Sequence, residues 1–229
     1  IALPDTIEAP LDQRPAHQFI IDALRSHPHD VTIIAVGRMT NLALALESAP
    51  DVTGLVHDVV VMGGAFGRNG HMGNVSPVAE ANIYGDPEAA DLVFGADWPV
   101  TITGLDVTQE TVMSDEFVSD LASVTGDDGR FIREVSAHYQ KFHMDSLGLD
   151  GFYVHDSSAV AFALRPDLFE TEQGPIRVVT DGIAKGQTIL RPAGRKFPPG
   201  AWDDRQVQSI CVGVDSASLL DFYRDTIVG

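Results

Sequence analysis

Short runs of apolar, often β-branched residues alternate along the chain with segments whose apolar residues recur at helical spacing. Residues 31–36 (VTIIAV) and 57–62 (HDVVVM) are mostly apolar, which is typical of strands buried on both faces of a sheet. Further strands are predicted at residues 99–103, 176–180 and 207–214. Helices are predicted at residues 16–25, 40–47, 86–94, 114–124, 131–143, 156–164 and 215–227.

This alternation of strand and helix predicts an α/β fold, with an open, mainly parallel sheet and helices on both of its faces. No linker interrupts the pattern, so we expect a single domain over residues 1–229. Ligands of such sheets bind beyond the carboxyl ends of the strands. The segments that follow the strands, and the one before Asp156, are therefore where functional side chains are expected.

Composition narrows the class of partner. The 229 residues include 15 basic and 33 acidic side chains, a formal net charge of −18. A surface of this sign repels nucleic-acid phosphates and anionic lipids, so we expect neither a nucleic-acid nor a membrane partner. No apolar stretch approaches the ~18 residues of a membrane span. The lone cysteine, Cys211, reads as a core residue and fits a reducing compartment, so a cytoplasmic protein is expected.

The glycine-rich segment after the second predicted strand carries an unusual set of polar residues. Asn74, Glu80 and Asn82 combine one carboxylate with two carboxamides. If the segment is extended, Glu80 and Asn82 point the same way because they are two residues apart. Such a set matches vicinal hydroxyls, which both donate and accept hydrogen bonds, so a sugar is a natural ligand. The alternative is a surface loop whose polar residues meet only water.

His155 and Asp156 open the predicted helix at 156–164. Histidine is the side chain best suited to proton transfer near neutral pH, and an adjacent carboxylate would bind a hard cation. The alternative is that Asp156 is an ordinary helix N-cap and His155 a solvated loop residue. The spacing does not decide between the two.

Aromatic and histidine side chains gather in the predicted helix at 131–143. His138 and Phe142 share one face of it, and Tyr139 and His143 share another. The pattern fits an amphipathic helix of mixed exposure, or a wall for a flat ligand. No Gly-x-Ser-x-Gly elbow occurs, so serine hydrolysis has no support.

Five blocks resemble, in order, the motifs of the inosine-uridine-preferring nucleoside hydrolases. They are VTIIAVGRMTNLALAL, VVVMGG, GNVSPVAEANIYGDPEAADLVF, TGLDVT and VHDSSAVAFALRPDLF. The resemblance runs through essentially the whole chain. It implies hydrolysis of the N-glycosidic bond of ribonucleosides, assisted by calcium, by a homo-oligomer.

The resemblance also implies roles for individual residues. Asn74, Glu80 and Asn82 would hold ribose hydroxyls, and Met62 would line the ribose pocket. Two further groups would serve the cation: Asp156 as a ligand of calcium that also touches the sugar, and Val36 through its backbone carbonyl. His155 would protonate the departing base. Tyr139, His143 and Phe152 are candidates for contact with that base.

The sequence departs from the family in one respect. The Asp-x-Asp-x-x-x-Asp-Asp motif, which in the family supplies calcium ligands and the water-activating carboxylate, does not occur here. We therefore expect the N-terminal part of the family fold to be missing, and weak calcium binding and turnover by residues 1–229 alone. The alternatives are a ribose- or nucleoside-binding relative with impaired catalysis, and a purely structural role.

Overall fold

The computed structural model describes residues 11–192 and 194–229, which fall into two compact units. The larger unit comprises residues 15–109 and 155–215. Among the described residues, the smaller unit comprises residues 11–14, 110–154 and 216–229. The assignment of residues 1–229 to a single domain stays a prediction.

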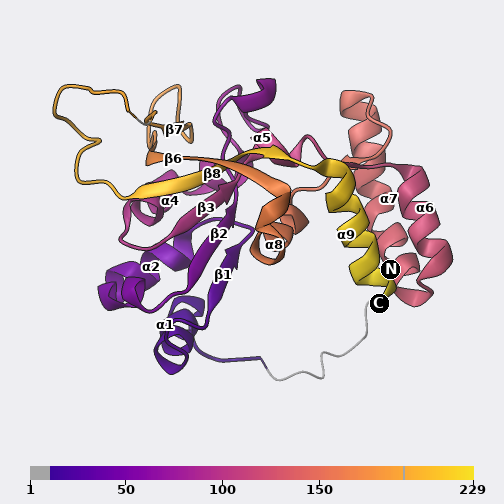
Figure 1. The fold of residues 1–229 in the computed structure, drawn as a ribbon, viewed down its shortest axis with the longest axis horizontal. Helices are drawn as coiled ribbons and strands as arrows, with labels where there is room; N and C mark the ends of the chain where they lie inside the picture. Colours follow the sequence, from indigo (N-terminus) through magenta and orange to yellow (C-terminus); the bar gives the residue numbers. More distant parts are fainter. Residues whose placement is uncertain (1–10, 193) are drawn as a thin grey trace. The chain divides into compact units, whose positions relative to one another are not determined.

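The larger unit is built on a six-stranded sheet with the strand order β1-β2-β3-β8-β6-β7 (Figure 1). The first four strands in that order run parallel, whereas β6 is antiparallel to β8 and β7 is antiparallel to β6. The predicted open, mainly parallel sheet is confirmed. The strands are β1 (Thr32–Ala35), β2 (Asp58–Met62), β3 (Val100–Thr103), β6 (Phe169–Val178), β7 (Thr188–Leu190) and β8 (Val207–Val214).

Helices cover both faces of this sheet, as predicted. On one face α1, α2 and α4 share a core with alternate residues of β2 and β3, such as Val59 and Ile102. On the other face α8 packs against Val60 and Met62 of β2 through Ala159. The helices of this unit are α1 (Ala16–Ser26), α2 (Thr40–Ser48), α3 (Ala81–Gly85), α4 (Pro87–Gly95), α5 (Leu105–Thr108) and α8 (Asp156–Leu164), with short 3-10 turns η1 (Pro50–Gly54), η2 (Arg68–Gly70) and η3 (Pro166–Leu168).

Two strands differ from their prediction. The apolar run at 31–36 is not buried on both faces, because the residues of β1 are half-buried or exposed at one edge of the six-stranded order. β6 begins at Phe169, seven residues before the predicted start at residue 176. Its first half reads as loop because Glu170 and its neighbours are polar and exposed, yet they pair in register with β8.

The smaller unit contains the helices α6 (Asp115–Val124), α7 (Asp127–Leu147) and α9 (Ser216–Val228), and a two-stranded sheet. The sheet pairs β4 (Val112–Met113) with β5 (Phe152–Tyr153). Its core is formed by Met113, Val118 and Val154, against which side chains of α7 and α9 pack. α7 begins at Asp127 rather than at the predicted residue 131, and Asp127 and Asp128 complement the positive end of the helix dipole.

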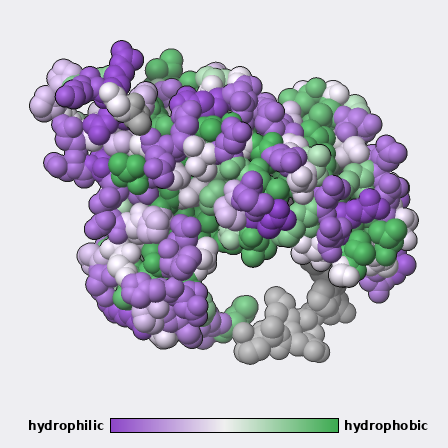
Figure 2. Space-filling view, in the orientation of Figure 1, coloured by the Kyte–Doolittle hydropathy of each residue, from purple (hydrophilic) through white to green (hydrophobic). Residues whose placement is uncertain are grey.

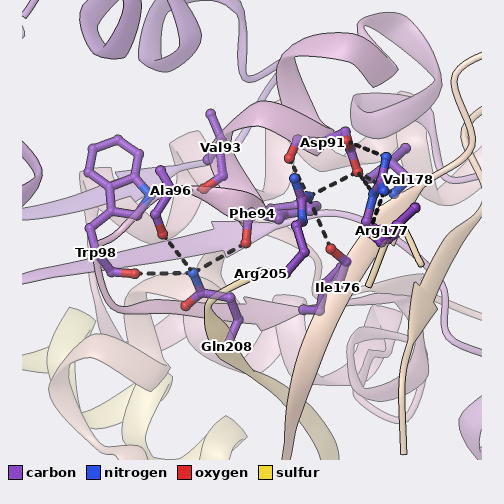
Figure 3. Close-up of polar contacts among 11 residues, drawn as sticks. Asp91, Val93, Phe94, Ala96, Trp98, Ile176, Arg177, Val178, Arg205 and Gln208 are labelled. Atoms are coloured by element: carbon purple, nitrogen blue, oxygen red, sulfur yellow. Dashed lines mark hydrogen bonds and ion pairs between the residues drawn. The ribbon is translucent and has the colours of Figure 1, made fainter. Parts of the chain in front are cut away.

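A partly buried polar network joins α4 to the antiparallel strands (Figure 3). The Asp91 carboxylate accepts hydrogen bonds from Arg177 Nε at 2.9 Å, from Arg205 Nη2 at 3.0 Å and from the backbone N–H of Val178 at 2.9 Å. Beside it, the buried Gln208 side chain of β8 bonds four backbone groups of the α4–β3 connection. These side chains supply hydrogen bonds that a regular sheet cannot offer at this turn.

The surface agrees with the acidic composition. The face drawn in Figure 2 is largely hydrophilic, with hydrophobic residues in small patches. Within the described ranges, 11–192 and 194–229, no helix is both long enough and apolar enough to cross a membrane.

Candidate functional site

The glycine-rich segment that follows β2 is held in place by Glu80. Its carboxylate accepts hydrogen bonds from the backbone N–H of Gly64 at 3.0 Å, of Asn82 at 2.9 Å and of Ile83 at 3.2 Å. Glu80 thereby caps α3, and its side chain is only 2% exposed. A buried carboxylate with three N–H donors is well solvated by the protein itself.

Two further side chains hold the same segment from other elements. Asp106 of α5 is fully buried and accepts hydrogen bonds from the backbone N–H of Phe66, at 2.9 Å, and of Arg68, at 2.6 Å. Thr188 of β7 accepts a hydrogen bond from Ala65 N at 3.0 Å and donates one to Ala65 O at 2.9 Å. The backbone between residues 64 and 68 is therefore fixed by side chains rather than by a ladder of neighbouring strands.

The glycines at this site are required by close packing. Gly64 has φ = +78°, a conformation that L side chains rarely adopt, and a Cβ there would lie 3.1 Å from the Thr188 side chain. A Cβ on Gly73 would collide with the backbone of Ser76 and Ala79. A larger residue at either position would displace the loop that carries Asn74 and Glu80.

Among the described residues, each of the two asparagine side chains forms hydrogen bonds through one end only. Asn74 Oδ1 accepts a hydrogen bond from Ala81 N at 3.0 Å, and Asn82 Nδ2 donates to the carbonyl of Met62 at 3.1 Å. Asn82 lies within α3, so the segment is not extended there, and the condition under which Glu80 and Asn82 would point the same way is not met. The two side chains are instead oriented by the turn of the helix that Glu80 caps.

His155 and Asp156 lie at the amino end of α8. His155 Nδ1 is 2.7 Å from Oγ1 of Thr108, the last residue of α5, which follows β3. This contact places the start of α8 at the carboxyl end of β3. The N-cap of α8 is His155. Asp156 is therefore the first helical residue and not the N-cap of the alternative interpretation. Among the described residues the Asp156 carboxylate has no hydrogen-bond partner.

The carboxyl groups at this edge share one electrostatic property. Burial raises the pKa of Glu80, of Asp106 and of Asp156 above their ordinary values. The negative charge of Asp156 contributes a further rise to the pKa of Glu80. Glu80 and Asp156, 76 positions apart in the chain, are therefore close enough for the charge of one to affect the pKa of the other. Such a site favours a cation, or a positive charge that develops during a reaction.

Met62 and Val36 end or follow the neighbouring strands. Met62, the last residue of β2, is 3% exposed, and its sulfur lies 3.5 Å from Asn82 Nδ2. Val36 follows β1 and is 42% exposed. Over residues 11–192 and 194–229, no group of three or more His, Cys, Asp or Glu side chains is placed to hold a metal ion. Asp156 and the Val36 carbonyl are oxygen donors of the kind calcium prefers, but calcium takes six to eight such ligands.

The aromatic candidates for contact with a base lie together in the smaller unit. The Tyr139 ring centroid is 4.3 Å from that of His143 and 5.7 Å from that of Phe152. His143 is 3% exposed whereas His138 is exposed, which confirms a helix of mixed exposure. Cys211 is fully buried in β8, as predicted, and burial raises its pKa to about 12.

Three residues that hold backbone or side-chain groups in place at this edge were not predicted from the sequence: Asp106, Thr108 and Thr188. The first two stand in the TGLDVT block, where a carboxylate and a hydroxyl in an otherwise apolar stretch after a strand are a usable signal. Thr188 lies in a short strand that the sequence analysis did not predict, and its contact with Ala65 spans 123 positions. No local pattern encodes that pairing.

Comparison with known proteins identifies the family. The sequence profile described as "Inosine-uridine preferring nucleoside hydrolase" matches residues 2–221. Uridine nucleosidase 1 of Arabidopsis thaliana is 34% identical over 213 residues, which cover 93% of this chain and 62% of that protein. The inosine-uridine preferring nucleoside hydrolase of Crithidia fasciculata is 34% identical over 191 residues, or 82% of this chain and 59% of that protein.

Solved structures agree with the sequence comparison. A plant nucleoside hydrolase superposes with a TM-score of 0.94 at 30% identity, covering 99% of this chain and 70% of the other. A purine-preferring ribonucleoside hydrolase from Gardnerella vaginalis gives a TM-score of 0.88 at 32% identity, covering 100% of this chain and 70% of the other. In the sequence comparison, this chain spans less than two thirds of the length of the Arabidopsis thaliana and Crithidia fasciculata proteins. Because the profile covers nearly all of it, the chain belongs to the inosine-uridine preferring nucleoside hydrolase family.

Proposed function

We propose that this protein hydrolyses the N-glycosidic bond of ribonucleosides to give ribose and a free base. The proposal is carried by the position of His155 and Asp156 at the amino end of α8, beyond the carboxyl end of β3. Thr108 holds the His155 ring there, and the charge of Asp156 acts on Glu80. The names of the similar proteins, which refer to uridine, inosine and purine ribonucleosides, support ribonucleosides as the substrate class.

Ribose hydroxyls would bind to the oxygen and amide groups of this edge. Among the described residues, Asn74 Nδ2 and Asn82 Oδ1 form no hydrogen bond, so one can donate to a hydroxyl and the other can accept from one. The Asp156 carboxylate likewise has no hydrogen-bond partner among the described residues. Glu80 caps α3, the helix that carries Asn82. Met62 would form the apolar wall under the sugar ring.

Cleavage of a glycosidic bond passes through a state in which positive charge develops on the ribose ring. The carboxylates of Glu80 and Asp156 would stabilise that charge, because partial burial strengthens the attraction. The leaving base gains electrons as the bond breaks, and a proton makes it a better leaving group. His155 is the residue we assign to deliver that proton.

Calcium is proposed as the cation of the site, with Asp156 and the Val36 carbonyl among its ligands. Both are oxygen donors, which fits calcium, yet they supply only part of the coordination set that calcium takes. When bound, such an ion would hold ribose hydroxyls and lower the pKa of a bound water. The residues described here would orient the sugar and move the proton to the base.

Three further proposals rest on the sequence rather than on the geometry. They are a single domain, from the absence of a linker in the pattern; a cytoplasmic location, from the lone cysteine; and assembly as a homo-oligomer, from the resemblance. The buried free thiol of Cys211 is compatible with a reducing compartment.

The test of the proposed function is the substitution His155→Ala in the purified protein. We expect kcat/KM for inosine to fall by roughly 10²- to 10⁴-fold, the usual contribution of a positioned acid. His57→Ala is the matched control, because His57 is exposed and precedes β2 at the amino end of the strand. Equal turnover by His155→Ala and wild-type protein would remove His155 from the mechanism.

A second candidate is a protein that binds nucleosides without cleaving them. The three backbone N–H groups that bind the Glu80 carboxylate favour it, since that carboxylate then serves the loop rather than a reacting group. Calorimetry with ribose and inosine, with and without calcium, paired with a reducing-sugar assay separates the two. Binding of inosine without release of ribose would select the second candidate.

A further inference from the structure

We infer that Thr108 is a positioning residue that fixes the orientation and the tautomer of His155. The inference rests on the proposed function, since it concerns how the proposed acid is prepared. Its basis is the 2.7 Å contact between Thr108 Oγ1 and His155 Nδ1. That contact joins α5 to the start of α8 across 47 positions of the chain.

Thr108 is held more firmly than a surface residue would be. It is fully buried, and its backbone N–H donates to the carbonyl of Gly104 at 3.1 Å. Leu105, Asp106 and Val107 beside it are buried as well, and Asp106 is itself bonded to the loop after β2. A β-branched side chain is stiff at χ1, and the close packing around Thr108 restricts its rotation further. The hydroxyl is therefore a fixed point against which the His155 ring is set.

The contact occupies Nδ1 of His155 and leaves Nε2 as the ring nitrogen that exchanges the proton. A hydroxyl can donate or accept, and we assign the accepting role to Thr108 Oγ1. In the imidazolium form of His155, Nδ1–H donates to Thr108 Oγ1 and Nε2–H is directed away from it. When the C1′–N bond breaks, its electron pair stays on the base, and the Nε2 proton moves to the base. The ring that remains is neutral and keeps Nδ1–H, so the bond to Thr108 persists through the step. Thr108 thus confines proton exchange to Nε2.

A neutral hydroxyl and a carboxylate at this position would affect the His155 proton differently. A carboxylate would stabilise the imidazolium and make the proton harder to release. A threonine hydroxyl orients the ring without adding charge beside the proton that is to be transferred. The edge already carries Glu80 and Asp156, so orientation rather than further negative charge is what Thr108 contributes.

The test compares Thr108→Val, which keeps the shape and removes the hydroxyl, with Thr108→Ser, which restores the hydroxyl. Thr101→Val is the matched control, because Thr101 is a buried threonine in the middle of β3. Two substrates are used: inosine, whose base needs a proton to leave, and 4-nitrophenyl β-ribofuranoside, whose leaving group departs without one. The neutral tautomer of His155 is read separately from its ¹⁵N chemical shifts.

Thr108→Val is expected to lower kcat for inosine by roughly 10- to 100-fold, with KM little changed, and to leave turnover of the nitrophenyl riboside close to wild type. Thr108→Ser should recover most of the loss. The ¹⁵N shifts should report Nδ1–H in the wild-type protein and a mixture of tautomers in Thr108→Val.

Three results would overturn the inference. One is a Thr108→Val protein as fast as wild type on inosine while His155→Ala is slow, which would leave the proposed function intact. Another is an equal loss on both substrates that serine does not repair, since that marks a purely structural role. The third is an unchanged His155 tautomer in Thr108→Val, which decides the matter even if the protein turns over no nucleoside. Full activity of His155→Ala would instead contradict the proposed function.

Discussion

We expect removal of the Gln208 side-chain amide to lower the free energy of unfolding of the larger unit strongly for so few atoms. It is 2% exposed, and Oε1 accepts a hydrogen bond from the backbone N–H of Val100 at 2.8 Å. Nε2 lies within 3.1–3.3 Å of the carbonyls of Phe94, Ala96 and Trp98 (Figure 3). Gln208→Leu keeps the approximate size of the side chain and removes all of these bonds.

The magnitude follows from the groups left behind. Nε2 has two protons for three carbonyls, so two hydrogen bonds are lost there and one at Val100, with each net bond worth about 1 kcal/mol. Because the Val100 N–H is left buried without an acceptor, its loss costs about 1–3 kcal/mol rather than about 1 kcal/mol, and the total is about 3–5 kcal/mol. The apolar leucine recovers about 1 kcal/mol of this. We expect a net loss of about 2–4 kcal/mol in the free energy of unfolding.

Urea unfolding followed by tryptophan fluorescence and circular dichroism measures this loss. Gln206→Leu is the matched control, because Gln206 is exposed and bonds only the Asp97 side chain, at 2.7 Å, among the described residues. Its effect should stay within about 0.5 kcal/mol. If Gln208→Leu unfolds at the same urea concentration as Gln206→Leu, the four backbone contacts do not stabilise the fold and the reasoning is wrong.

Two other predictions concern titrating groups. Burial raises the pKa of Asp106 above its ordinary value of 3.8. The folded state therefore binds a proton at this group more tightly than the unfolded state does. As a result, the contribution of Asp106 to stability falls as the pH rises from 3.8 through the raised pKa. Asp106→Asn should therefore weaken the dependence of the urea midpoint on pH in that range, and an unchanged dependence would contradict the assignment. Cys211, with its pKa raised to about 12 and its side chain fully buried, should resist iodoacetamide in the native protein and react once the protein is unfolded in urea. Labelling of the native protein at the rate of a free thiol would show that β8 is not packed as described.

Much of the larger unit could be predicted because its strands and helices have strong local patterns. The apolar run before Gly63 became β2, and the stretch after His155 became α8, with boundaries within a residue of those predicted. Only the last three residues of β6 were predicted, because its exposed, partly acidic first part pairs with β8 through backbone bonds that no side-chain pattern reports. The exposure of β1 depends on its place in the sheet order, which local sequence does not state.

The site was predicted in its residue types more than in its geometry. Glu80 was expected to face a ligand, whereas its carboxylate first satisfies the N–H groups of Gly64, Asn82 and Ile83. Glu80 can bind these groups only because α3 begins at Ala81. The polar stretch around it has no helical periodicity from which that helix could be predicted. Thr108 was missed because its partner lies 47 positions away, and contacts of that range come from the topology.

The central claim is that the edge formed by Glu80, His155 and Asp156 cleaves ribonucleosides with water. Chromatography of the purified protein incubated with uridine or inosine, calcium and inorganic phosphate tests it most directly. The account predicts equal amounts of free base and free ribose, with both products lost in Asp156→Ala. Formation of ribose 1-phosphate, or equal amounts of ribose from wild-type protein and Asp156→Ala, would contradict it.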